Sequence, residues 1–203
     1  MSINKRITCI CSIIVISAAL IACRVHDVNE RVSTGEIAYS LGEEFGAEFE
    51  NSNSNNVDES DLHFVANKLQ IYSYDDVRTK FPEYESEIVI SDPSIDMHVA
   101  VVDFEVFNIS TSEQKVPLYD FNLQSGSWHN AVNLELYKLF NDGAGPTAIL
   151  HPYETGQFSL TYVIFDKQFR SRSLMEKTLN GPYDLVISSY PNSIKIILET
   201  IGK

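Results

Sequence analysis

The chain has 203 residues, of which 28 are acidic and 15 are basic, so its net charge is −13 at pH 7. A field of this sign opposes binding to nucleic acid and to anionic lipid, and it favours basic partners or weakly held cations. All three cysteines lie within the first 23 residues, which excludes an intramolecular disulfide or a cysteine zinc site in the remainder.

The N-terminus has the pattern of an export signal. Lys5 and Arg6 precede an uncharged apolar run, Ile7 to Cys23, that ends with the small residue Ala22 before Cys23. A basic start holds that end in the cytoplasm, while the apolar run partitions into the bilayer. We therefore expect residues 1–22 to be a signal peptide and the rest of the chain to lie outside the cytoplasm.

The end of the run, Leu20-Ile21-Ala22-Cys23, resembles the lipobox of bacterial lipoproteins position by position. The resemblance implies a diacylglyceryl thioether on Cys23 and cleavage after Ala22, with palmitate-type chains anchoring the protein on the extracytoplasmic face of the membrane. The alternative is an uncleaved transmembrane helix, although a run of 17 residues is at the lower limit for spanning. Without Lys5 and Arg6, 13 basic residues face 28 acidic ones, a charge of about −15.

Residues 23–61 are predicted to be a polar linker. Asn, Ser, Asp and Glu dominate Asn51 to Asp61, and such a composition buries too little apolar surface to offset the entropy of ordering. A calcium loop is the alternative for this segment, but it lacks the EF-hand spacing and glycine. Ile37 to Phe49 is expected to add at most one short edge strand, around Leu41-Gly42.

Residues 62–203 are predicted to form one strand-rich domain. Val65 to Tyr74 is rich in β-branched and aromatic residues, and Asp75-Asp76 is expected to cap a short helix through Lys80. Met97 to Ser110 is the clearest strand, with its apolar residues at period two and Asp103 and Glu105 on a wet face. Its first half adds Val99 and Val101, which predicts burial on both faces.

Further strands are predicted from alternating apolar residues between turn signals. Asn141-Asp142-Gly143 is one such turn, and Asp166 to Asn180 breaks the alternation and is expected to be a loop with one or two helical turns. The predicted alternating sets are Tyr119, Phe121 and Leu123; Val132, Leu134 and Leu136; Phe158, Leu160, Tyr162 and Ile164; Leu185 and Ile187; and Ile194, Ile196 and Leu198.

Seven or eight short strands without a βαβ rhythm indicate an all-β, two-sheet antiparallel sandwich. Residues Val65 to Ile201 resemble the telokin-like, immunoglobulin-like domains of uncharacterised lipoproteins from Gram-positive bacteria. The resemblance is carried by the strand ending in Phe107-Asn108-Ile109-Ser110, by the Leu150-His151-Pro152 to Gly156 turn, and by the closing strand pair. It implies the fold and a surface location, and it brings no catalytic residues.

Few residues suggest chemistry. Asp96 and His98 share one strand face and would supply two metal ligands if a third lay close, but a solvent-facing histidine is the commoner outcome. Ser125, Ser127 and His129 surround Trp128 without a recognisable base and orienting group. The acidic pairs Glu43-Glu44 and Asp75-Asp76 diverge, and Asn108-Ile109-Ser110 is a chance glycosylation sequon. We expect tyrosines 72, 74, 153, 183 and 190 to pack in the core and its rim; the alternative is an exposed binding face.

The sequence therefore predicts a lipid-anchored envelope protein that binds a ligand or a protein partner, or supports an envelope complex, without catalysis. Cys23 is the one residue with an assigned chemical role, and no cofactor or metal is expected. The alternatives are an envelope hydrolase with a carboxylate site and a ligand-binding component of an uptake system. A deep polar pocket favours a ligand or an enzyme, whereas a flat aromatic edge favours protein binding.

Overall fold

The computed structural model describes residues 24, 35–46, 61–82, 95–188 and 193–199. The chain divides into two compact units, Met1–Gly35 and Glu36–Lys203. The predicted signal peptide, the lipobox and the linker segment 51–60 lie outside the described residues. In the part that is described, no helix has the length and apolar character needed to cross a membrane.

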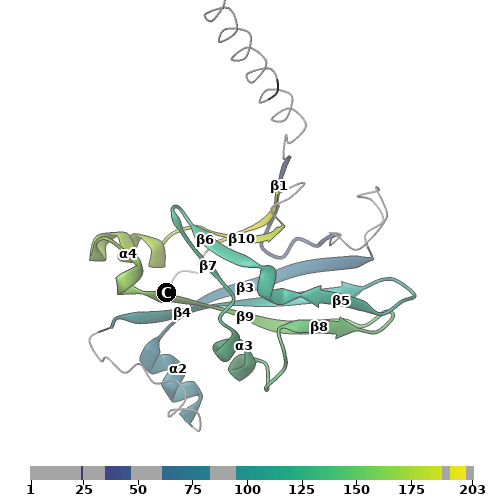
Figure 1. Cartoon of the computed structure of the whole chain (residues 1–203), viewed down its shortest axis with the longest axis horizontal. Coiled ribbons are helices and arrows are strands. Elements are labelled where there is room, and N and C mark those ends of the chain that lie inside the picture. The colour runs from purple at the N-terminus through teal and green to yellow at the C-terminus, as the bar shows by residue number, and fades with distance from the viewer. Residues whose placement is uncertain (1–23, 25–34, 47–60, 83–94, 189–192, 200–203) are drawn as a thin grey trace, which may run out of the picture. The chain divides into compact units, whose positions relative to one another are not determined.

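The Glu36–Lys203 unit is built on two main sheets and a small third one. A four-stranded sheet has the order β2-β3-β4-β9, and it lies between a five-stranded sheet, β1-β11-β10-β6-β7, and two short helices, α2 and α3 (Figure 1). The four-stranded sheet is formed by β2 (Phe45–Gly46), β3 (Leu62–Ser73), β4 (Met97–Asn108) and β9 (Thr155–Phe165), and all its pairs are antiparallel.

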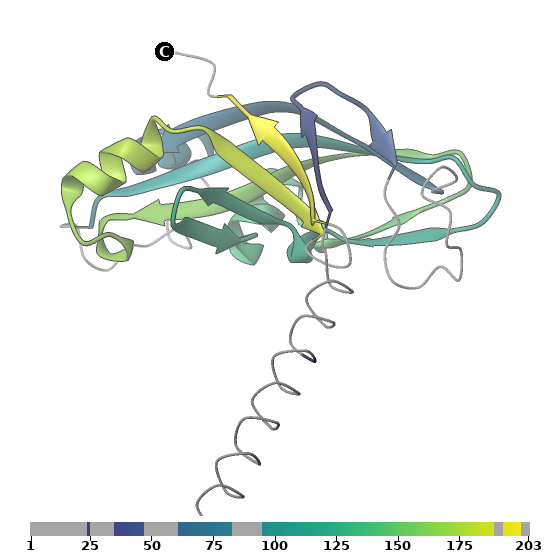
Figure 2. The same ribbon diagram turned by 90° about the horizontal axis from the view of Figure 1, so that it is seen from above.

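The five-stranded sheet covers the inner face of the first. Its strands β10 (Tyr183–Ser188), β11 (Ser193–Leu198), β6 (Asn122–Ser125) and β7 (Trp128–Ala131) pair antiparallel. At one edge β1 (Glu36–Ser40) runs parallel to β11, as Figure 2 shows from above. The third sheet pairs β5 (Gln114–Pro117) with β8 (Thr147–Leu150).

The main core lies between the two large sheets. Period-two alternation sends one set of side chains from each strand inward, so the four predicted inward residues of β4 are all buried: Ala100, Val102, Phe104 and Val106. From β9, Leu160, Tyr162 and Ile164 join the same core, and Phe158 packs against it. The predicted all-β sandwich is confirmed, and so are the strands predicted on β3, β4, β9, β10 and β11.

A second, smaller apolar cluster lies on the outer face of the four-stranded sheet. Val99 and Val101 of β4 are buried there against Val77 of α2 (Tyr74–Lys80) and Leu136 of α3 (Leu134–Phe140). The prediction that the first half of β4 is buried on both faces is therefore confirmed. The helices cover only this part of the sheet, which leaves Asp103 and Glu105 beyond them.

One predicted strand is wrong, and a second begins later than predicted. Val132, Leu134 and Leu136 belong to no common strand face, because Asn133 caps α3 by accepting a hydrogen bond from the Leu136 N–H, and Leu134 then points to solvent. The set Tyr119, Phe121 and Leu123 begins in a 3₁₀ helix, η3 (Leu118–Asp120), and only Leu123 lies on β6.

The predicted helical segments are present. α2 has its cap two residues before the expected Asp75-Asp76: Ser73 is the N-cap, and its hydroxyl and backbone exchange hydrogen bonds with Asp76. The loop predicted from Asp166 to Asn180 holds η4 (Asp166–Gln168) and α4 (Arg172–Leu179). The turn at Asn141-Asp142-Gly143 is confirmed, with Asp142 and Gly143 at positive φ of 52° and 81°.

The domain begins earlier than the predicted boundary at residue 62. Two strands, β1 and β2, flank Leu41-Gly42, which form the turn between them and not the strand that was expected. Backbone pairing with β11 and β3, stacking of Tyr39 on Phe45 with ring centroids 4.2 Å apart, and the Lys195–Glu36 ion pair at 2.8 Å hold this segment on the domain. The predicted linker 23–61 is therefore divided by an ordered segment.

Candidate binding site

A concave site lies on the outer face of the four-stranded sheet, beside the second apolar cluster. We call it the outer-face pocket; its volume is about 460 Å³. Strands β3, β4 and β9 supply its floor, and the end of α3 with the turn that follows supplies its wall. Its lining residues are Asn67, Asp103, Phe104, Glu105, Phe140, Asn141, Asp142, Ala144, Gln157, Phe158 and Ser159.

The two carboxylates of the floor come from the alternation of β4. Phe104 points into the main core, so Asp103 and Glu105 on either side of it point to the outer face. This is the wet face predicted from the sequence. Two residues along a strand span about 6.6–6.8 Å, which sets the spacing of the two Cα atoms.

Glu105 is held in position by amide side chains from both neighbouring strands. The Asn67 Nδ2 donates to Glu105 Oε1 at 2.8 Å, and the Gln157 Nε2 donates to the same oxygen at 3.4 Å. Asn67 is available for this bond because the β3–β4 register shifts between Ala66 and Lys68, which leaves Asn67 unpaired in a bulge. The outcome is a carboxylate with a defined orientation in the pocket.

The wall of the pocket is locked to β9 by Asn141. Its Nδ2 donates to the Tyr137 carbonyl at 2.7 Å and to the Ser159 carbonyl at 2.9 Å, and its Oδ1 accepts from the Ser159 N–H at 2.8 Å. A side-chain amide thus pairs with the β9 edge as another strand would. Farther along the same edge, Asn133 N–H donates to the Thr161 carbonyl and Asn130 Nδ2 donates to the Val163 carbonyl.

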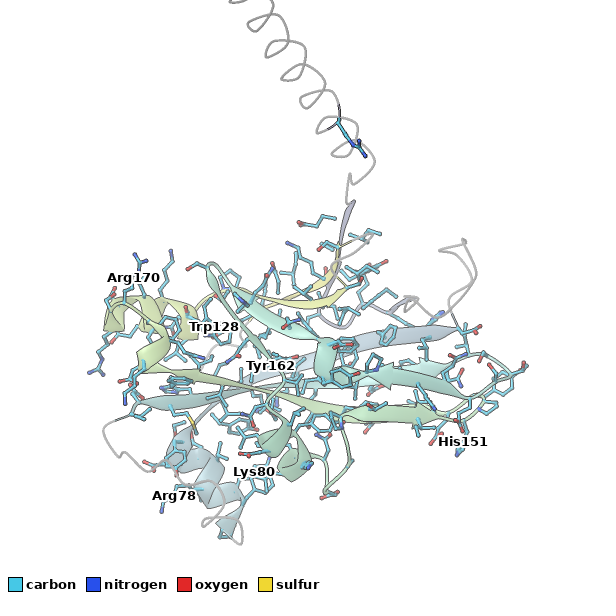
Figure 3. All side chains as sticks on the ribbon, in the orientation of Figure 1. Arg78, Lys80, Trp128, His151, Tyr162 and Arg170 are labelled. Carbon is cyan, nitrogen blue, oxygen red and sulfur yellow. The ribbon has the colours of Figure 1, made fainter. Side chains whose placement is uncertain are left out.

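An aromatic group borders the pocket at Phe140. The Lys80 ammonium lies 4.9 Å from the centroid of the Phe140 ring, 5.2 Å from that of Tyr72 and 5.6 Å from that of Phe81. Figure 3 labels Lys80 on α2, on the helix-covered side of the domain. Burial, together with the nearby Asp103 carboxylate, raises the pKa of Tyr72, so its hydroxyl stays neutral at ordinary pH.

The histidines predicted as weak candidates are dispersed. His98 Nε2 lies 3.2 Å from Asp96 Oδ1, as their shared strand face suggested, but they gain no further ligand among the described residues. Nowhere in the described ranges do three His, Cys, Asp or Glu side chains gather closely enough for a metal ion. His63 pairs with Glu44 at 2.6 Å, and His151 lies 3.7 Å from Glu113 at the β5–β8 end of the domain (Figure 3). His26 lies outside the described residues.

The serines around Trp128 lie at the β6–β7 turn. Ser125 ends β6, Ser127 lies in the turn and His129 is exposed on β7. The Trp128 indole is buried and donates from Nε1 to Gln168 Oε1 at 3.1 Å, and its ring meets Tyr183 edge-on. Trp128 therefore has a structural role that joins β7 to η4.

The tyrosines predicted for the core and its rim behave differently from one another. Tyr183 is buried and Tyr72 and Tyr74 are half-buried, as predicted, but the prediction is wrong for Tyr153, which is 71% exposed because it lies in the turn between β8 and β9; Tyr190 lies outside the described residues. Asn108 of the sequon is 1% exposed, and its Nδ2 donates to the carbonyls of Ser112, Leu150 and His151. Its side-chain nitrogen is thus committed to holding two loops together.

The family comparison matches residues 36–194 to the model of a domain of unknown function, DUF5028. The chain belongs to the DUF5028 family. The match begins at the residue where β1 begins, so the family model includes the segment that precedes the predicted domain boundary. A comparison with curated proteins gives no match.

Two solved structures are similar to this DUF5028 protein. An uncharacterised β-sandwich protein from Clostridium difficile has 10% sequence identity and a TM-score of 0.43, over 82% of this chain and 97% of its own. A conserved hypothetical protein from Bacillus anthracis has 16% identity and a TM-score of 0.38, over 71% of this chain and 89% of its own.

The residues that build the pocket were only partly visible in the DUF5028 sequence. Asp103 and Glu105 were placed on the wet face of the correct strand, and the Asn141 turn was identified. Asn67 and Gln157 were missed, since their shared contact with Glu105 joins positions 38 and 52 residues from it. The residues next to Asn67 in the sequence do not indicate which distant side chain its amide will contact.

Proposed function

We propose that this DUF5028 protein is an exported lipoprotein, anchored through Cys23 on the extracytoplasmic face of a bacterial membrane, whose sandwich domain binds a ligand without catalysing a reaction. The observation that carries the anchor is the order of the N-terminal residues: two basic residues, an uncharged run and the Leu20–Cys23 tetrapeptide. Two acyl chains would be sufficient for stable attachment, because each buried methylene contributes about 0.8 kcal/mol.

The start of the domain supports a short tether. Twelve residues, Arg24–Gly35, separate Cys23 from the unit that begins at Glu36. At no more than about 3.6 Å per residue step, the thirteen steps from Cys23 to Glu36 keep Glu36 within about 47 Å of the anchored residue. β1, the first strand of that unit, belongs to the five-stranded sheet, whereas the outer-face pocket lies on the outer side of the four-stranded sheet.

The shape of the outer-face pocket favours the binding of a small ligand, whereas a flat surface would favour the binding of a protein. Its volume of about 460 Å³ falls within the ~300–1,000 Å³ of small-molecule sites. Polar groups from three strands converge on it, and hydrogen bonds within the scaffold fix Glu105 and Asn141 before any ligand arrives. Such preorganisation reduces the entropy that binding has to overcome.

The anchor is tested by metabolic labelling with a radioactive fatty acid. Cys23→Ala is expected to abolish labelling and to leave the precursor uncleaved between residues 22 and 23. Cys9→Ala is the matched control, because that cysteine lies in the segment that is removed, and its variant is expected to be labelled and cleaved normally. Labelling that persists in Cys23→Ala would exclude the proposed anchor.

An envelope hydrolase is the second candidate, on the strength of one observation. Asp103 and Glu105 both line the outer-face pocket from one face of β4, and a pair of carboxyl groups at one site is what glycosidases require. Incubating purified protein with envelope polysaccharide and measuring released reducing ends tests it. If the unmodified protein releases reducing ends and both Asp103→Asn and Glu105→Gln do not, the proposed non-catalytic function is wrong and the protein is a hydrolase.

A further inference from the structure

We propose that the outer-face pocket binds an organic cation, an alkylammonium or guanidinium group, between the Glu105 carboxylate and the Phe140 ring. The inference rests on the proposed binding function and adds the chemical class of the ligand. It stands on three features of the pocket: the sign of its charges, the free oxygen of a fixed carboxylate, and an aromatic ring in its wall.

The charges that line the pocket are negative. Among the described residues that line it, Asp103, Glu105 and Asp142 are the ionisable ones, and none is a lysine, arginine or histidine. The nearest base by strand register is Lys68, which pairs opposite Asp103 and still leaves the group negative. The net negative charge of the whole chain also attracts cations.

Glu105 presents one oxygen to the ligand. Both amide donors, Asn67 and Gln157, bind Oε1, so within the described ranges Oε2 has no hydrogen bond from the protein. A carboxylate held by one oxygen is oriented and keeps acceptor capacity on the other. Charge-assisted hydrogen bonds from an ammonium or guanidinium group match this acceptor, and the two amides provide the rigidity that the match requires.

Phe140 supplies the apolar part of the recognition. Its ring is in the pocket wall, and aromatic faces attract cations, as the Lys80 ammonium 4.9 Å from the ring centroid illustrates. Lys80 itself is not a lining residue. The combination of a carboxylate, an aromatic ring and ~460 Å³ of space suits a cation that carries an alkyl chain.

A bare metal ion fits the pocket less well. No cluster of three metal-ligating side chains occurs in the part of the chain that the structure describes, so Asp103, Glu105 and Asp142 do not converge on one point. Ca²⁺ and Mg²⁺ require six or more oxygen ligands, several of them from the protein when binding is tight. A larger organic cation spans the carboxylates without that convergence.

The test is a calorimetric and NMR titration of the full-length protein in non-ionic detergent. Agmatine, which carries a guanidinium and an ammonium group, is titrated against MgCl₂ of the same ionic strength. We expect saturable agmatine binding, with amide shifts confined to residues 103–105, 140–142 and 157–159. Shifts that do not saturate, or that Mg²⁺ reproduces, would overturn the proposal.

Two variants distinguish binding in the pocket from a general effect of the negative charge of the protein. Glu105→Gln keeps the shape and the Asn67 hydrogen bond, and it is expected to weaken agmatine binding at least fivefold. Asp120→Asn removes the same charge from an exposed position on η3 and is expected to change the affinity less than twofold. Equal losses of agmatine affinity in the two variants would refute the site. If Glu105→Gln lowers the melting temperature markedly, Asp103→Asn is used in its place.

The source of the cation is resolved by a second titrant. Tighter binding of the peptide Gly-Arg-Gly than of agmatine would indicate a basic side chain of a protein partner, and the reverse order would indicate a free small molecule. Both outcomes support the cation site. Fatty-acid labelling of Cys23 is independent of this pocket, so loss of agmatine binding with labelling intact would refute the ligand class alone.

Discussion

The main core and the outer cluster differ in how they are enclosed, although both are built on β4. Phe104 is 1% exposed between two full sheets, and the rings of Phe64 and Phe121 pack against it. Val101 is also buried, but its cover is two helices of seven residues each, α2 and α3. One strand therefore supports a layer of extended sheet pairing and a layer of short, separately capped helices.

This difference explains where the pocket lies. Sheet-on-sheet packing continues along the whole inner face of β4, whereas the helices cover only the outer face around Val99 and Val101. Beyond their edge the strand presents Asp103 and Glu105, and the end of α3 forms a wall beside them. A partial second layer thus makes a concave site that a simple two-sheet sandwich does not provide.

Truncating the two sides of β4 is expected to give the largest contrast. Phe104→Ala removes a ring from the main core and is expected to lower the free energy of unfolding by about 3–5 kcal/mol. Val101→Ala in the outer cluster removes two methyl groups and is expected to lower it by about 1–2 kcal/mol. Urea denaturation measures both; equal losses would show that the helices enclose Val101 as firmly as the sheets enclose Phe104.

Asn141→Ala is expected to have an intermediate effect at the seam between α3 and β9. The change removes three hydrogen bonds and leaves the Ser159 N–H and carbonyl to water, at a cost of about 1–3 kcal/mol. Hydrogen exchange of the Ser159 amide is expected to accelerate in parallel. Asn122→Ala is the control, since it removes one exposed bond to the Asp120 carbonyl and is expected to cost less than about 1 kcal/mol. If Asn141→Ala lowers the free energy of unfolding no more than Asn122→Ala does, the strand-like role of Asn141 is contradicted.

How far the sequence predicts this molecule depends on how local each signal is. The two-faced burial of β4 was visible, because Val99 and Val101 interrupt the alternation within a few residues. α3 was mistaken for a strand, since Val132, Leu134 and Leu136 alternate over too short a span to distinguish the two periods, and Asn133 then caps a helix. β1 was missed as a full strand because its partner β11 lies more than 150 residues away and half of its side chains face solvent.

The smallest effect is expected from Tyr137, the residue through which α3 reaches the main core. Its neighbour Leu136 belongs to the outer cluster, whereas the Tyr137 ring is buried between the sheets. Within the described residues its hydroxyl has no hydrogen-bond partner, and burial raises its pKa from 10.0 to about 12. A buried hydroxyl without a partner loses its hydration without compensation, so Tyr137→Phe is expected to raise the free energy of unfolding slightly, by about 1 kcal/mol, near neutral pH.

The effect of Tyr137 is expected to appear in alkali. Because the folded state holds the phenol proton more tightly than the unfolded state, the stability linked to this group is fully present below pH 10 and is lost as the pH rises towards about 12. The decline is therefore expected to be shallower in Tyr137→Phe than in the unmodified protein when urea denaturation is repeated between pH 9 and pH 12. Tyr119→Phe is the control, since Tyr119 is 45% exposed and its ring lies outside both apolar clusters. Identical slopes in all three proteins would mean that the Tyr137 phenol ionises equally easily when folded, and that α3 does not seal its hydroxyl between the sheets.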